Sequence, residues 1–157
     1  MFHAKSRGKR QVVVFESQMH TASFDRMEMR GDLARAVTSE QFVAHYQPVI
    51  DIETHQIVGA EALIRWNHPE RGLVGPGLFI PLAEETGMIG ALGEWILERA
   101  CTDMARWRSD YGEMASDLTI SVNLAVQQLH DDLILNKVRD ILARTGLPAQ
   151  RLVLEVT

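Results

Sequence analysis

The sequence predicts an α/β fold. Apolar stretches of strand length alternate along the chain with longer amphipathic stretches of helix length, and the order strand, loop, helix recurs. This alternation is typical of parallel strands that are joined by right-handed crossovers through helices. At this level both a doubly wound sheet and a barrel fit the pattern.

The composition is that of one folded domain. The 157 residues are 46% hydrophobic and 24% charged, which argues against wholesale disorder and against a fibrous repeat. Acidic residues outnumber basic ones, 21 to 16. This excess argues against a whole-surface footprint for nucleic acid, although a local basic pocket stays possible. We therefore expect no nucleic-acid partner.

The first 38 residues have a different character from the rest. Residues 1–20 combine a basic stretch with a short strand-like run, Gln11 to Phe15, and look like the C-terminal remnant of a preceding domain. Residues 21–38 predict a connector helix. Its expected apolar face consists of Phe24, Met27, Leu33 and Val37.

Residues 39–157 carry the repeating pattern. Helix ends are indicated by Gly87 and by Gly146, which has Pro148 beyond it. The chain stops on an apolar strand with no helix after it, so we expect a domain truncated after that strand. The expected strands are 42–50, 57–66, 118–124 and 151–156, with turn residues at 51–55 and a loop at 67–77, and the expected helices are 78–85, 89–108 and 132–145.

Polar side chains interrupt one face of three of these strands. Successive side chains of a strand point to opposite faces, so each of these strands has one wholly apolar face, suited to packing under helices. The opposite faces carry Glu61, Asn123 and Glu155 toward the carboxyl ends of their strands. Two carboxylates and an amide provide oxygen ligands only, which suit Mg²⁺ or Mn²⁺ better than zinc. Strand-end residues that bond loops or face solvent are the open alternative.

Other candidate groups are less informative. Arg65 shares a face with Glu61 and fits either a phosphate or an ion pair with Glu61 or Glu155. We assign no chemistry to His55 or His68, which fall in expected loops and have no second histidine at metal-ligand spacing. The sequence has no Walker loop, GxGxxG, GxSxG or CxxC motif, which removes the commoner nucleotide, serine-hydrolase and zinc sites.

Cellular location is inferred from two features. The single cysteine, Cys101, lies in a helical pattern and is expected to be a buried structural thiol, which suits a reducing compartment. No apolar run approaches the roughly 18 residues that span a bilayer, and the amino-terminal apolar run is too short for a signal peptide. We expect a cytoplasmic protein with no membrane segment in this chain.

Several separated motifs, in order, resemble one bacterial family. The chain from about residue 39 to 157 closely resembles the first half of the EAL domain of cyclic di-GMP phosphodiesterases. Residues 1–20 more weakly resemble the tail of a GGDEF diguanylate cyclase domain, through Ala4-Lys5, Gly8-Lys9 and the run Val12 to Phe15. The EAL motifs are Gln47-Pro48-Val49, Glu61-Ala62-Leu63-Ile64-Arg65-Trp66, His68-Pro69, Phe79-Ile80-Pro81, Ala83-Glu84, Ser121-Val122-Asn123-Leu124 and Leu154-Glu155-Val156-Thr157.

The resemblance implies a TIM-like (β/α)₈ barrel with its site at the carboxyl ends of the strands. It implies that Glu61, Asn123 and Glu155 are metal ligands. Leu63 and Arg65 would grip cyclic di-GMP, and Gln47 would be a weaker substrate-side contact. In the family, two metal ions activate a water that opens cyclic di-GMP to linear pGpG.

The resemblance also implies what the chain does not include. A further Glu, a pair of aspartates, a lysine that is the general-base candidate, and later Glu and Gln site residues would all follow Thr157. We therefore assign no catalytic residue within the chain and expect no catalysis from it alone. The half barrel would also expose two unpaired strand edges.

Two other functions stay open. A degenerate EAL domain would bind cyclic di-GMP as a receptor without catalysis, although such domains typically lose metal ligands that this chain retains. An interaction protein using its exposed edges has no positive feature in the sequence. The complete protein would be a candidate for an EAL–EAL homodimer.

Overall fold

The computed structural model describes residues 17–129 and 133–156, with side chains from residue 25 onward. The strand-like run at 11–15 lies outside these residues, as do Asp132 and Thr157. The strands are β1 (Phe42–Ile50), β2 (Ile57–His68), β3 (Gly72–Val74), β4 (Thr119–Leu124) and β5 (Leu152–Val156). The helices are α1 (Ser17–Ala36), α2 (Pro76–Thr86), α3 (Ile89–Tyr111), α4 (Val126–Leu129) and α5 (Ile134–Thr145), with 3₁₀ turns at Gly112–Ala115 and Ala149–Arg151.

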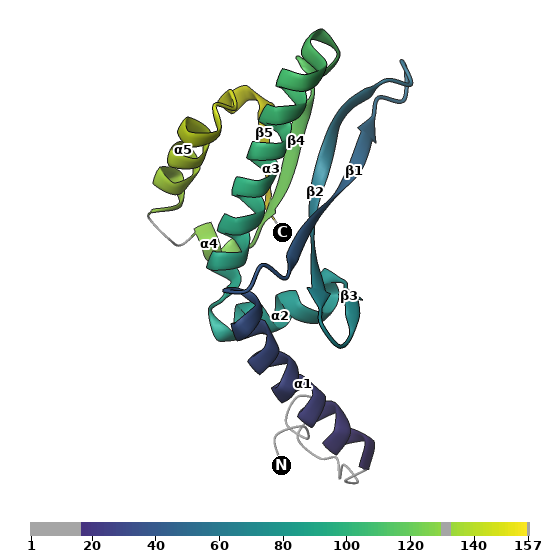
Figure 1. Ribbon diagram of the computed structural model, residues 1–157, viewed down its shortest axis with the longest axis vertical. Helices are drawn as coiled ribbons and strands as arrows, with labels where there is room; N and C mark the ends of the chain where they lie inside the picture. Colours follow the sequence, from purple (N-terminus) through teal and green to yellow (C-terminus); the bar gives the residue numbers. More distant parts are fainter. Residues whose placement is uncertain (1–16, 130–132, 157) are drawn as a thin grey trace, which may run out of the picture.

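The strands form one open sheet in the order β1-β2-β4-β5, and β3 pairs with the end of β2 (Figure 1). The pairs β2–β4 and β4–β5 are parallel, as the alternation of strands and helices predicts. β1 and β3 run antiparallel to β2, which the alternation does not predict. The reason is that short turns, not helices, connect them to β2, and a short turn reverses the chain.

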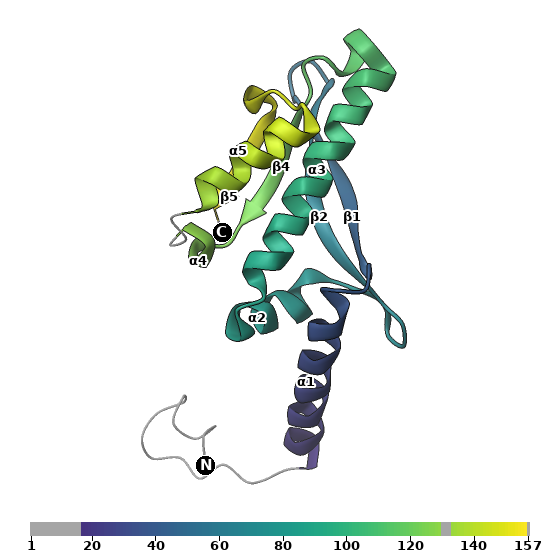
Figure 2. The same ribbon diagram turned by 60° about the vertical axis from the view of Figure 1, so that its left-hand side comes forward.

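Helices α3 and α5 lie over one face of the sheet (Figure 2). The apolar faces of β2 and β4 pack beneath them, as predicted. Cys101 of α3 is fully buried in this layer, which confirms the expected buried thiol. The cluster consists of Ala62, Ile96, Leu97, Ala100, Cys101, Met104, Ile120, Val122, Ile141 and Leu147.

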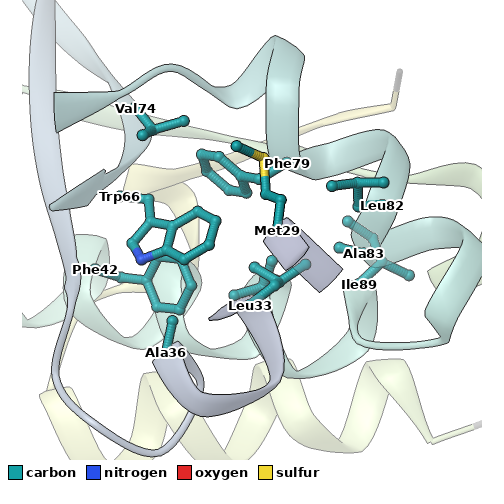
Figure 3. Packing of buried hydrophobic residues seen from close by; sticks show 11 residues of the cluster. Met29, Leu33, Ala36, Phe42, Trp66, Val74, Phe79, Leu82, Ala83 and Ile89 are labelled. Atoms are coloured by element: carbon teal, nitrogen blue, oxygen red, sulfur yellow. The ribbon is translucent and has the colours of Figure 1, made fainter. Parts of the chain in front are cut away.

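A second core joins α1 and α2 to the ends of β1 and β2 (Figure 3). Phe42 lies at its centre, with ring centroids 6.1 Å from Trp66 and 5.9 Å from Phe79. The carboxyl-terminal half of α1 contributes Met29, Leu33 and Ala36, and the other half of the helix projects from the body (Figure 1). The members are Met29, Leu33, Ala36, Phe42, Trp66, Val74, Phe79, Leu82, Ala83, Ile89 and Leu92.

The buried face of α1 differs from the expected one. Leu33 is buried as predicted, but Met27 is 67% exposed and Val37 is 36% exposed, while the side chain of Phe24 lies outside the described part of the chain. Met29 and Ala36 take their places, because steps of four and three residues from Leu33 bring them to the side that meets α2.

The ends of the elements follow local chemistry. Pro76 opens α2 two residues before the expected start, since proline fits the first helical position. Gly87 and Gly146 adopt left-handed φ values of 74° and 71° and end α2 and α5 as predicted. In the described ranges no helix is both long enough and apolar enough to cross a membrane.

Candidate functional site

The three predicted metal ligands come from three neighbouring parallel strands. Asn123 of β4 is aligned with Glu155 of β5, and its Nδ2 donates a hydrogen bond to Glu61 Oε1 of β2 at 2.7 Å. Glu61 and Asn123 are half-buried, and Glu155 is exposed. The arrangement therefore places two carboxylates and one amide on adjacent strands.

Gln47 joins this row from the other side. It is aligned with Glu61 in the antiparallel pair β1–β2, and it is exposed. Side chains directly opposite in an antiparallel pair lie on the same face of the sheet. Gln47, Glu61, Asn123 and Glu155 thus form a polar row across four strands.

The donor set of this row fits a hard divalent cation. Its groups offer oxygen atoms, and the carboxylates are open to solvent in part or fully, so a cation could replace water there at moderate cost. In the part of the chain that the structure describes, no three His, Cys, Asp or Glu side chains gather as a metal-binding group. A cation held in this row would take the amide oxygen of Asn123 as its third protein donor, beside the carboxylates of Glu61 and Glu155.

Arg65 lies on the same face of β2 as Glu61, four residues further along the strand. Its Nη1 donates to the backbone carbonyl of Ile64 at 2.9 Å. Among the described residues it forms no ion pair with Glu61 or Glu155. The carboxylate pairing that the sequence left open is therefore absent, and the guanidinium keeps donors for an anionic group.

A pocket of about 360 Å³ lies between α2, α3, the middle of β2 and the end of β4, and it reaches the row at Asn123. Leu63 and Asn123 both line it, so the pocket contacts two of the predicted site residues. Its remaining wall is largely apolar. That wall consists of Ala62, Ile64, Pro76, Gly77, Ile80, Pro81, Glu84, Ile89, Leu92, Gly93, Ile96, Ala125 and Gln128.

Sequence reasoning did not identify Gly93 and Gln128 as pocket residues. A glycine inside a helix often marks the close approach of another group, and that signal was available at Gly93. A Cβ built on Gly93 would lie 2.1 Å from Gln128 Nε2. The Gln128 side chain, only 7% exposed, therefore occupies the space that a side chain at position 93 would need.

His68 supports the turn that connects β2 to β3. It belongs to the end of β2, not to a loop as expected, and it is buried. Its Nδ1 accepts the backbone N–H groups of Glu70 and Arg71 at 3.1 and 3.2 Å. Nε2 lies 3.1 Å from Asp32 Oδ2, and since Nδ1 is an acceptor, Nε2 carries the proton that is donated to Asp32.

The other side of β1 is fixed by Tyr46. Its hydroxyl donates to Asp103 Oδ2 at 2.6 Å, and Arg99 Nε donates to the same oxygen at 2.8 Å. Burial, followed by the hydrogen bond to Asp103, raises the pKa of Tyr46 well above its ordinary value of 10.0. This part-buried cluster, in which only Asp103 is fully enclosed, anchors β1 to α3 next to Gln47.

Comparison with known proteins points to one family. The family model described as "EAL domain" matches residues 30–157. The chain is 41% identical over all 157 residues to the bifunctional diguanylate cyclase/cyclic di-GMP phosphodiesterase MucR of Pseudomonas aeruginosa, of which it covers 22%. It is 35% identical over its full length to the cyclic di-GMP phosphodiesterase NbdA of the same species and covers 20% of that protein.

Solved structures share the fold. The chain superposes on the P. aeruginosa MucR phosphodiesterase in complex with c-di-GMP with a TM-score of 0.76 and 41% identity, over 81% of this chain and 50% of that one. For the EAL enzyme Bd1971, bound to cAMP and cyclic di-GMP, the TM-score is 0.78 at 31% identity, over 86% of this chain and 37% of that one. The chain thus spans about a fifth of the two curated relatives and at most half of these structures.

Proposed function

The chain belongs to the EAL-domain family, and from this premise we propose that it is the N-terminal part of a metal-dependent phosphodiesterase that hydrolyses cyclic di-GMP to pGpG. Its open sheet matches part of an EAL barrel. We propose that residues 39–157 are the first half of that domain and residues 21–38 its connector helix. Residues 1–20 would be the tail of a GGDEF domain.

One observation carries this proposal. The Asn123–Glu61 hydrogen bond brings together two of the three predicted ligands, and the third, Glu155, is the register neighbour of Asn123. Glu61 lies in the middle of β2, not toward its carboxyl end as expected, and side chains that only bonded loops would not meet across strands. The Asn123–Glu61 bond also orients both groups, since an amide that donates through Nδ2 presents its carbonyl oxygen elsewhere.

We propose that Glu61, Asn123 and Glu155 hold Mg²⁺ or Mn²⁺. When bound, such a cation would lower the pKa of a coordinated water and stabilise the negative charge that develops on the phosphoryl oxygens. The protein side chains align their oxygens on a rigid sheet, and half-burial of Glu61 limits competition from solvent. No residue of the chain is assigned as general base, and the family pattern would supply one beyond Thr157.

The substrate would lie along the same row. Leu63 lines the apolar pocket, which suits a flat base, and Arg65 would fork onto a phosphate through its remaining N–H groups. Gln47, exposed beside Glu61, would donate or accept one hydrogen bond at the substrate edge. A cytoplasmic location and an EAL–EAL homodimer of the complete protein stay predictions.

The test uses the 157-residue chain and the complete protein that contains it. Each is incubated with cyclic di-GMP and Mn²⁺, binding is measured by calorimetry, and pGpG by chromatography. We expect turnover by the complete protein and none by the chain alone. Glu61→Ala should abolish turnover, whereas Glu113→Ala, an exposed carboxylate before the start of β4, should leave it unchanged.

The outcomes separate the functions. Binding by the complete protein without turnover would favour a receptor over an enzyme. Turnover by the 157-residue chain, lost in Glu61→Ala, would overturn the requirement for residues beyond Thr157. Absence of both binding and turnover in the complete protein would overturn the proposed function.

A further inference from the structure

The backbone that leaves β4 after Asn123 is held by the side chain of Gln128. The Ala125 N–H donates to Gln128 Oε1 at 3.1 Å, and the Gln128 N–H donates to the carbonyl oxygen of Ala125 at 2.9 Å. Ala125 precedes α4, and Gln128 is its third residue. A glutamine there that binds the N–H before the helix is one half of a capping box.

Gln128 is itself fixed from the other side. Its amide lies against the backbone of α3 at Gly93, where an added Cβ would be 2.1 Å from Nε2 and 2.7 Å from Cδ. Gly93 and Gln128 are both buried, so the amide has little room to move. The contact therefore connects α3 to the segment that follows β4.

Asn123 needs such a support. The pairing of β4 with β2 ends at Val122 and Ala62, one residue before Asn123. Beyond that point β4 is paired only with β5, at whose far edge the structure describes no further strand. The next contacts that restrain the backbone are the two hydrogen bonds between Ala125 and Gln128.

We propose that Gln128 is a positioning residue for Asn123. Packed against Gly93, it holds the backbone that follows β4, so that the Asn123 amide keeps its orientation toward Glu61. The part of this inference that concerns metal binding rests on the proposed function. Gln128 touches neither metal nor reacting atoms in this role. It acts through Asn123.

The first test reports on the hydrogen bonds without any ligand. Hydrogen exchange of the Ala125 amide and of the Asn123 side-chain NH₂ is measured by NMR on the 157-residue chain. Gln128→Met keeps the length of the side chain and removes the acceptor, so both groups should exchange about tenfold faster, the factor expected when one hydrogen bond is lost. Gln128→Glu keeps an acceptor oxygen and should preserve slow exchange.

Gln127→Met is the matched control, since Gln127 is exposed and adjacent in sequence. It should change neither rate. Unchanged exchange of the Asn123 NH₂ in Gln128→Met would overturn the proposal, whatever the chain binds.

Gly93 offers an independent variant. Gly93→Ala should displace the Gln128 amide and accelerate exchange at Ala125 as Gln128→Met does. In a Gln128→Ala background the clash is gone, so Gly93→Ala should have no further effect on that exchange. If Gly93→Ala accelerated exchange equally in both backgrounds, the proposed contact between Gly93 and Gln128 would be contradicted.

The second test measures whether the contact between Gln128 and Gly93 affects metal binding. Mn²⁺ affinity should fall about tenfold in Gln128→Met, as when a residue that orients a metal ligand is removed. In an Asn123→Ala background Gln128→Met should cause no further loss, since Gln128 acts only through Asn123; an undiminished loss there would overturn the proposal. Absence of Glu61-dependent Mn²⁺ binding in the unmodified chain would defeat the metal site and leave the exchange test to decide the positioning role.

Discussion

Asn123 joins two neighbouring parallel strands through its side chain, because its Nδ2 donates to Glu61 Oε1 across 2.7 Å. Backbone pairing alone holds β4 to β2 only as far as Val122. The side-chain bond extends this connection to the residues that the proposed function uses. Its removal should therefore be visible both in stability and in metal response.

We predict that Asn123→Asp lowers the free energy of unfolding by about 1–3 kcal/mol in the presence of a chelator, since a half-buried carboxylate loses its donor and faces a like charge. Mn²⁺ should recover much of this loss, because the cation offsets the repulsion. Urea denaturation with and without Mn²⁺ measures both effects. Asn136→Asp, at an exposed site on α5, makes the same charge change, but it should neither lower the free energy of unfolding nor make it respond to Mn²⁺. An equal loss of stability in Asn136→Asp would refute the explanation.

Tyr46 should impose an alkaline limit on stability. Burial and the bond to Asp103 raise the folded-state pKa of Tyr46 above the ordinary 10.0, so its contribution is complete below about pH 10 and is lost as pH rises beyond it. Tyr46→Phe should cost about 1 kcal/mol at pH 7 and show a smaller penalty at pH 11. Urea denaturation at both pH values checks this, and Tyr111→Phe, at a 58% exposed site, should show no such pH dependence.

Glu85 reports the docking of α1 on α2. Its carboxylate pairs with Arg30 and Arg26, and the hydrogen bond from Arg30 is the largest cause that lowers its pKa below the ordinary 4.5. Arg30→Ala should move the pKa of Glu85 upward, and Arg26→Ala should do so by less, as measured by NMR titration of the carboxyl carbon. Stabilisation from this pairing is present above the ordinary pKa and fades as pH falls through the lowered one. Arg35→Ala, whose partner is Asp32, should leave Glu85 unchanged; a shift of equal size would exclude the assigned cause.

The sequence was most informative where a pattern is local. Alternation along the strands predicted the apolar face under α3 and the common face of Glu61, Asn123 and Glu155. It could not predict that Asn123 would bond Glu61, because that depends on the register between β2 and β4. Nor could helical periodicity choose Met29 over Met27 as the buried residue of α1, since the choice depends on where α2 lies. The contact of Gln128 with Gly93 could not be predicted either, because it depends on how α3 packs against the segment that follows β4.

Gly59 should be essential to the register that aligns Glu61. Gly59 is the register partner of Thr119, and a Cβ at Gly59 would lie 2.5 Å from Thr119 Oγ1 and 2.6 Å from its backbone oxygen. The hydroxyl could rotate away, but the backbone oxygen belongs to the β2–β4 ladder, so Gly59→Ala must push the strands apart. We expect a loss of about 1–3 kcal/mol in the free energy of unfolding, together with faster hydrogen exchange of the β4 amides that face β2. Gly90→Ala is the control, since a Cβ at this second residue of α3 meets nothing within 4 Å and alanine forms helix more readily than glycine, so that variant should be no less stable than the unmodified chain. Stability of Gly59→Ala equal to that of the unmodified chain would mean that β2 and β4 are not held in this register.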